Sequence, residues 1–154
     1  LIPMPTNSHA LLALAQHFQQ LHAQTQDEAV LRAALSRFYF ATLHCVAQTF
    51  KPLRSDSLHP PRSKDYAYEA VIGRVVAYGR TEGEENQPAR TQANGIAKML
   101  PLIKRMQVLA DYDLAFTITT MMVEDTRIRC EQIVRWCNNI RQTTDKDQAE
   151  AVIP

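Results

Sequence analysis

Apolar residues recur at steps of three and four positions over most of the 154-residue chain, and no stretch alternates strictly between apolar and polar residues. The first spacing is that of one face of an α-helix, whereas a half-buried β-strand needs the alternation. Only four Gly interrupt the pattern, which therefore predicts an all-α protein. Short connections favour antiparallel neighbours, so we expect an antiparallel bundle of four to five helices.

Five helical segments follow from this periodicity and from the positions of capping residues, Pro and Gly. The segment over residues 51–62 holds three Pro and two Ser and is predicted to be the longest loop. We expect Pro101 to kink or split the fourth helix. The helices are predicted over residues 8–24, 27–50, 63–78, 88–109 and 117–141 of a single domain that spans 1–154, with flexible ends at 1–6 and 142–154.

Four of these helices carry an apolar stripe that should be buried against a neighbour. The predicted stripes are Ala10, Leu11, Leu14, Phe18 and Leu21 in the first helix; Val30, Leu31, Leu35, Phe38, Leu43, Val46 and Phe50 in the second; Tyr66, Ala70, Val71, Val75 and Tyr78 in the third; and Ile118, Met121, Met122, Ile128, Ile133, Trp136, Cys137 and Ile140 in the last.

The charges nearly cancel, with 17 Lys and Arg against 16 Asp and Glu. No general basic field therefore favours nucleic acid, and any RNA contact must be local. No apolar run approaches the roughly 20 residues that span a bilayer, and no basic segment leads into an apolar one at the N-terminus. We expect a soluble, cytoplasmic protein without membrane contact.

Neither a metal site nor a cofactor site is predicted. The three Cys, at positions 45, 130 and 137, lack C-x-x-C spacing and are expected to be buried thiols. His17 and His22 are five positions apart and so lie on different helix faces. The Gly-rich and zinc-binding signatures of nucleotide-binding folds, P-loops and zincins are absent from the sequence.

Arg37 and His44 are the residues that suggest chemistry. A separation of seven positions returns to nearly the same helix face. A histidine can act as acid or base at neutral pH, and an arginine can hold a phosphate, so the pair could cleave RNA without a metal. In the structural alternative, His44 donates one hydrogen bond inside the bundle and Arg37 pairs with an acid such as Asp111.

Two segments carry a family resemblance. The stretch Ser-Arg-Phe-Tyr-Phe-Ala-Thr-Leu-His, residues 36–44, resembles the S-R-x-Y-Y-A-x-F-H helix of the HEPN superfamily (higher eukaryotes and prokaryotes nucleotide-binding domain). Residues 110–113, Ala-Asp-Tyr-Asp, resemble the A-D-Y-D segment of its small stand-alone bacterial branch. The resemblance implies a four- or five-helix bundle, commonly a homodimer, and in many relatives a metal-independent ribonuclease.

The chain departs from the signature of active relatives, R-x4-6-H at the start of the last major helix. Here Arg105 is followed by Asp111 and Tyr112, with Asp in the place of His and Gln107 where the branch has Arg. An ionised carboxylate cannot act as a general acid and repels phosphate. Either His44 takes over the chemistry, or Arg37, His44, Asp111 and Tyr112 form a structural network in which the carboxylate orients the guanidinium and imidazole.

Two functions are therefore expected. The first is an RNA-binding or metal-independent ribonuclease role in a bacterial toxin–antitoxin or defence system, with Arg37 and His44 as catalytic pair and Arg105, Asp111 and Tyr112 as RNA contacts or network. The resemblance adds a possible cognate nucleotidyltransferase that adenylylates Tyr112. The alternative is a non-catalytic antitoxin, immunity or adaptor protein that keeps the bundle.

Overall fold

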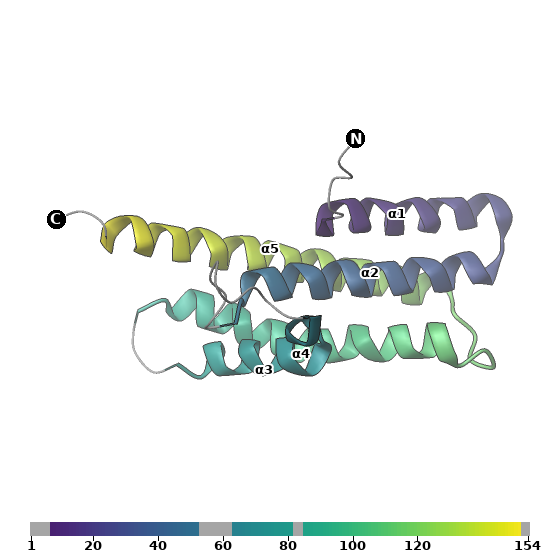
Figure 1. Ribbon diagram of the computed structural model, residues 1–154. Helices are drawn as coiled ribbons and strands as arrows, with labels where there is room; N and C mark the ends of the chain where they lie inside the picture. Colours follow the sequence, from purple (N-terminus) through teal and green to yellow (C-terminus); the bar gives the residue numbers. More distant parts are fainter. Residues whose placement is uncertain (1–6, 53–62, 82–84, 152–154) are drawn as a thin grey trace.

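In a computed structural model, which describes residues 7–52, 63–81 and 85–151, the chain forms an elongated helical bundle (Figure 1). α1 lies over a middle layer of α2 and α5, and α3 and α4 form the layer below. The described residues contain no strand, which confirms the predicted all-α bundle. The elements are α1 (Ser8–Thr25), α2 (Glu28–Thr49), the 3-10 helix η1 (Ser63–Tyr66), α3 (Tyr68–Gly79), α4 (Gln87–Tyr112) and α5 (Thr120–Ala151).

Side-chain caps set the ends of the α1–α2 hairpin. The Asn7 side chain accepts a hydrogen bond from the Ala10 amide at 2.8 Å and begins α1. Asp27 accepts one from the Ala29 amide at 2.9 Å and begins α2. Gln26, between the helices, has a left-handed backbone with φ 55°. Each carboxylate or amide oxygen satisfies an amide that the first helical turn leaves unpaired.

One predicted helix end is wrong, and the split predicted at Pro101 does not occur. α4 continues through Pro101 as one helix, because Pro101 faces solvent while Leu100 and Ile103 on the opposite side are held in the core. α5 runs ten residues past the predicted end at 141, so residues 142–151 form helix and not a flexible tail. That extension is rich in helix-forming Gln, Ala, Glu and Lys. Residues 53–62 of the loop predicted at 51–62, and the chain ends at 1–6 and 152–154, lie outside the described residues.

The core is built around α2, which contacts every other helix. Most predicted positions of α2 are buried, and Phe38 and Leu35 are among the largest fully buried side chains. In the last helix Met121 and Ile128 are 72% and 50% exposed, so their predicted burial is wrong. In the third helix the predicted core residue Tyr66 is also exposed.

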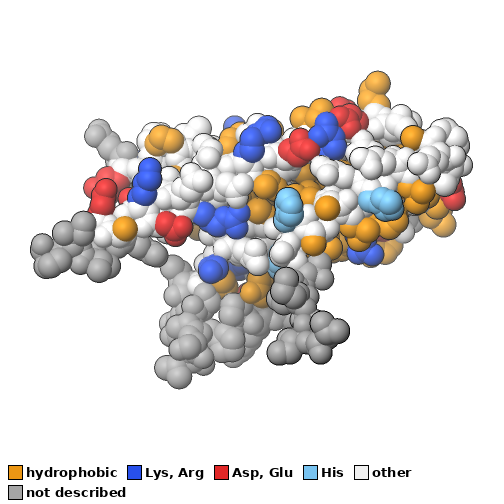
Figure 2. Space-filling view, turned by 90° about the horizontal axis from the view of Figure 1, so that it is seen from above, with side chains coloured by type: hydrophobic (Ala, Val, Ile, Leu, Met, Phe, Trp, Pro, Cys, Tyr) orange, Lys and Arg blue, Asp and Glu red, His pale blue; other side chains and the backbone are white. Residues whose placement is uncertain are grey.

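The predicted stripe of α1 is largely uncovered. Only Ala15 of α1 is fully buried, and Ala10 and Leu14 of the predicted stripe are exposed. α1 packs mainly on α2, and its Gln19 reaches α5 by donating a hydrogen bond to Glu124 at 2.7 Å. A single neighbour cannot cover a stripe as wide as that of α1. Figure 2 shows hydrophobic side chains gathered over the half of the molecule where α1 lies.

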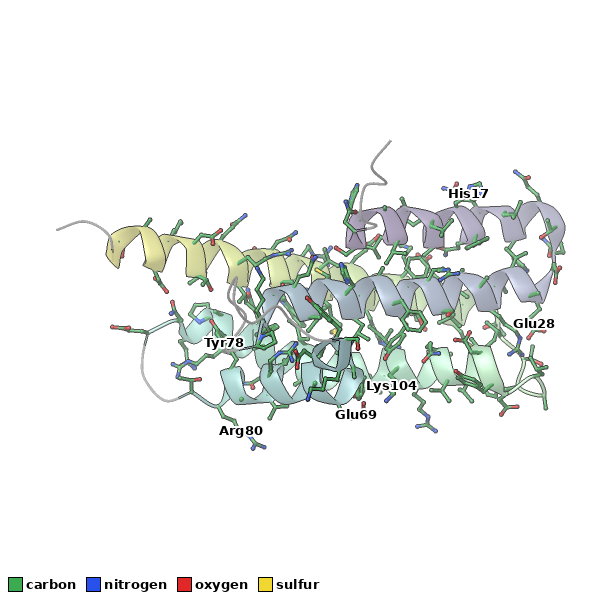
Figure 3. The ribbon with its side chains drawn as sticks, in the orientation of Figure 1. His17, Glu28, Glu69, Tyr78, Arg80 and Lys104 are labelled. Carbon is green, nitrogen blue, oxygen red and sulfur yellow. The ribbon has the colours of Figure 1, made fainter. Side chains whose placement is uncertain are left out.

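Close packing joins α4 to α5, and an ion pair joins α4 to α3. A Cβ on Gly95 of α4 would lie 2.7 Å from the Trp136 ring of α5, so this glycine allows the two helices to approach. Lys104 of α4 contacts Glu69 of α3 at 3.2 Å and lies 3.9 Å from the Tyr68 ring centre (Figure 3). Within the described residues, no helix has the length and apolarity to cross a bilayer.

Candidate functional site

α2 places Arg37, Phe40 and His44 on successive turns of one face. Arg37 is exposed, the Phe40 ring is 43% exposed, and His44 is half-buried. The buried Tyr39 ring contacts Phe40 edge-on with 5.0 Å between ring centres, which holds the Phe40 ring in place. We call Arg37, Phe40 and His44 the α2 stripe. It offers a cation, an aromatic face and an imidazole to solvent.

The polar side chains of the α2 stripe have no partner among the described residues. Among the described residues, neither the Arg37 guanidinium nor the His44 imidazole forms an ion pair or a side-chain hydrogen bond. Arg37 projects from the bundle at a position that a phosphate from solution can reach. The structural alternative, in which His44 donates a hydrogen bond within the bundle, is therefore not seen in the described part of the chain.

Asp111 is bound to α2 by a different residue from the one expected. Its Oδ2 accepts a hydrogen bond from Ser36 Oγ at 3.1 Å and another from Gln107 Nε2 at 2.5 Å. Ser36 is the neighbour of Arg37, about 100° away around the helix. The predicted network of Arg37, His44 and Asp111 is thus wrong for the described residues. Asp111 instead connects the end of α4 to the middle of α2.

Arg105 and Tyr112 lie on the outer face of α4, opposite the buried Ile103 and Gln107. Tyr112 is 78% exposed and does not take part in the Asp111 hydrogen bonds. The predicted site residues are therefore divided over two surfaces. Arg37 and His44 share the α2 stripe, whereas Arg105 and Tyr112 share an α4 face on which Leu102 and Val108 are also exposed.

A hydrogen-bond network that the sequence did not reveal surrounds Arg32. Its Nη1 donates to the backbone carbonyls of Leu109, Ala110 and Asp113 at 3.2, 2.9 and 3.1 Å. Its Nη2 donates to the Phe116 carbonyl and to Glu28. The guanidinium thus binds backbone carbonyls at the C-terminal end of α4 and in the loop that follows it. The sequence signal was limited to the spacing of Glu28 and Arg32, which permits an i,i+4 pair.

Glu28 extends this network to α5. One of its carboxylate oxygens accepts the backbone N–H of Ile118 at 2.9 Å, in the segment just before α5. This hydrogen bond, followed by the one from Arg32, lowers the pKa of Glu28. The start of α2 is consequently fixed to the loop between α4 and α5. Figure 3 shows Glu28 at that end of the bundle.

A second unpredicted cluster joins two buried thiols to an arginine. Cys45 and Cys137 share a hydrogen bond, and Arg141 Nη2 lies 3.8 Å from Cys45 Sγ. The shared hydrogen bond is the main reason why the pKa of Cys45 is lowered and that of Cys137 is raised. The positive charge of Arg141 also lowers the pKa of Cys45. The prediction that all three Cys are buried is confirmed.

Among the described side chains, no group of three or more His, Cys, Asp and Glu lies together as metal ligands would.

Comparisons with known proteins assign no family or function to these residues. No family model, no curated protein and no solved structure matched the chain.

Proposed function

We propose that the protein binds single-stranded RNA along the α2 stripe and that it cleaves RNA there without a metal ion. The observation that supports this proposal is the exposure of Arg37, Phe40 and His44 on one face, with no partner for either polar group among the described residues. Single-strand binding sites combine a cation for the backbone with an aromatic ring on which a base stacks. The α2 stripe has both within two helical turns.

The chemistry would use His44 as the base and Arg37 as the electrostatic partner. His44 takes the proton of a ribose 2′-OH, and the 2′ oxygen forms a bond to phosphorus. The bond from phosphorus to the 5′ oxygen breaks, and the leaving oxygen takes a proton from water. Arg37 neutralises the charge that develops on the phosphate. The two residues are about 10 Å apart along the helix axis, so the Arg37 side chain has to extend toward His44.

Asp111 supports this division of roles. Its carboxylate is bonded to Ser36 and Gln107, which gives it a positioning role for α2 and leaves the acid–base step to His44. The resemblance to the HEPN superfamily favours the same kind of chemistry. It also favours a homodimer and a toxin–antitoxin or defence setting, in which RNA cleavage would harm the host or an invading genome.

The test combines binding and cleavage. In filter binding, Arg37→Ala should weaken the affinity for a single-stranded RNA and reduce its salt dependence by about 0.7 in the log–log slope, as expected for one lost phosphate contact. Phe40→Ala should cost about 1–3 kcal/mol if a base stacks on the ring. Arg80→Ala, which removes an exposed charge outside the α2 stripe, is the matched control.

Cleavage is measured by incubating the wild type and His44→Ala with a mixed RNA pool in the presence of EDTA. Wild-type cleavage that His44→Ala abolishes, with an unchanged circular dichroism spectrum, supports the ribonuclease. If Arg37→Ala and Phe40→Ala bind RNA as the wild type does, the α2 stripe is not the RNA site. If the wild type binds but does not cleave, the protein is a binder alone.

A second candidate function follows from the outer face of α4. Leu102, Val108 and Tyr112, which flank Arg105 at helical spacing, are 47%, 42% and 78% exposed. Such an apolar stripe is typical of a protein interface, and it favours an antitoxin, immunity or adaptor protein. Light scattering of the wild type and of Leu102→Ser with Val108→Ser tests it. A wild-type dimer that the double variant converts to monomers shows that this face joins two copies. If the wild type and the double variant are both monomers, the face is available to bind a different protein.

A further inference from the structure

A cavity of about 820 Å³ lies at the C-terminal end of α2, outside the α2 stripe. Its walls come from the end of α2 and the three residues after it, from α3 and Thr81 just beyond it, and from the C-terminal half of α5. Small-molecule sites typically measure about 300–1,000 Å³ and combine apolar walls with a few convergent polar groups. The volume is far larger than a single phosphate ion needs, and it suits an organic molecule.

The cavity is positively charged. Three cationic side chains, Lys51, Arg74 and Arg141, line it against one acidic side chain, Asp145. The three cations come from three different segments, so no single helix accounts for the excess. For a chain whose charges nearly cancel overall, this concentration of cations is a local feature. Converging cations of this kind attract an anion.

Arg74 has a donor that is not used. Its Nε donates to the Phe50 carbonyl at 2.5 Å, which anchors the side chain at the end of α2. Its Nη2 is buried and has no hydrogen-bond partner. Burial lowers the pKa of Arg74, and the nearby charge of Asp65 offsets part of that effect. A partly buried guanidinium whose Nη2 lacks a partner gains from an anionic acceptor, because buried polar groups are nearly always bonded.

Arg141 faces the cavity from α5. It donates to Asn138 Oδ1 at 2.6 Å and contacts Cys45 Sγ at 3.8 Å, so its guanidinium is held in one orientation. The Thr144 hydroxyl, also in the wall, donates to the Ile140 carbonyl at 3.0 Å. Two oriented guanidiniums from different helices provide the forked donors that recognise phosphate oxygens.

An aromatic wall adjoins these cations. Phe50 and Tyr78 pack edge-on with 5.4 Å between ring centres, and both line the cavity. Figure 3 shows Tyr78 on α3 in this part of the molecule. Burial raises the pKa of Tyr78, which keeps its hydroxyl protonated and available as a donor. The walls therefore provide an apolar surface next to the cationic groups, as a ligand with a ring and a charged end requires.

We propose that this cavity binds a small organic phosphate, with the phosphate held by Arg74 and Arg141 and the organic part against Phe50 and Tyr78. The size of the cavity, its excess of cations, the unpartnered donor of Arg74 and the aromatic wall all support the same ligand class. The proposal does not depend on RNA binding at the α2 stripe.

Isothermal titration calorimetry of the full chain tests the proposal with adenosine monophosphate and ribose 5-phosphate, and with adenosine and ribose as controls. The phosphorylated compounds should bind at least tenfold more tightly than their unphosphorylated forms. Arg74→Gln and Arg141→Gln should each weaken that binding about tenfold or more, because each removes charge-assisted hydrogen bonds. Arg135→Gln, an exposed change on α5 that is not in the wall, should leave it unchanged.

Arg74 and Arg141 also make internal contacts, so a variant that blocks the cavity provides a second test. Ala77 is exposed and lines the cavity, and Ala77→Trp should fill the cavity and abolish binding without removing a core contact. The proposal is overturned if neither phosphate compound binds at millimolar concentration, if adenosine binds as tightly as its monophosphate, or if folded Arg74→Gln and Ala77→Trp both bind like the wild type.

Discussion

Replacing Arg32 with alanine should destabilise the fold more than replacing Arg37, the other arginine of α2. The Arg32 side chain is only 13% exposed and donates to four backbone carbonyls from the end of α4 and the following loop. Without Arg32, the carbonyl of Leu109 keeps the Asp113 amide as a donor, and the carbonyl of Asp113 keeps the Phe116 amide. The carbonyl of Ala110, a residue that is 3% exposed, has least access to replacement water.

The size of the effect follows from these contacts. An unsatisfied buried acceptor costs about 1–3 kcal/mol, and the remaining carbonyls regain part of their bonding from water. Losing the ion pair with Glu28 adds little to this loss of stability, because water screens an exposed carboxylate. We therefore expect Arg32→Ala to lower the free energy of unfolding by about 3 kcal/mol. In a domain of this length that corresponds to a fall in Tm of about 6–12 °C.

Urea unfolding followed by circular dichroism measures this change, with Arg37→Ala as the matched control. Arg37 is on the same helix and is exposed, so its removal should change the free energy of unfolding by less than about 0.5 kcal/mol. The midpoint of Arg32→Ala should fall while the slope with urea stays constant. If both variants unfold at the same urea concentration as the wild type, the carbonyl network contributes no stability and our reasoning is wrong.

Two further predictions concern packing and pH. In thermal melting, Gly73→Ala should stabilise α3 by about 0.5–1 kcal/mol, because nothing lies within 4 Å of a Cβ at Gly73. Gly95→Ala should instead destabilise the fold by about 1–3 kcal/mol, because the new Cβ clashes with Trp136. Equal melting temperatures for the two variants would contradict the close contact between α4 and α5. Hydrogen bonds from Arg127 and Gln19 lower the pKa of Glu124 to about 2. Because the folded pKa lies below the unfolded value of about 4.5, the stability from Glu124 is present above pH 4.5 and is lost as the pH falls toward 2. Glu124→Gln should therefore be less stable than the wild type at pH 7 and differ progressively less from it toward pH 2. A difference that does not change with pH would count against the lowered pKa of Glu124. Asp125→Asn, which changes an exposed acid one residue away, is the control.

The helices could be predicted because their apolar spacing is a local property of the chain. Their burial was predicted less well, because the spacing shows which side is apolar but not how many neighbours cover it. α1 has one main neighbour, so Leu14 stayed exposed. The last ten residues of α5 have few apolar residues, and their helix depends on propensity instead.

The candidate site was predictable only where helix geometry fixes it. Arg37 and His44 share a face because they are seven residues apart on one helix. The partner of Asp111 depends on how α2 and α4 are rotated against each other, and a rotation of one residue exchanges Arg37 for Ser36. The Arg32 network has backbone carbonyls as partners, which every residue carries and which leave no sequence signal. The cavity could likewise not be predicted from the sequence, because its walls come from three segments that are far apart along the chain.

The contact between Gly95 and Trp136 also provides an optical reporter. Trp136 is the only tryptophan in the chain, and it is half-buried where α5 packs on α4. Its intrinsic fluorescence therefore originates at one interface and needs no attached dye. A shift of its emission to longer wavelength would signal water entering between these two helices, separately from events at α1. Comparing that signal with the loss of total helix would show whether α4 separates from α5 before the bundle as a whole unfolds.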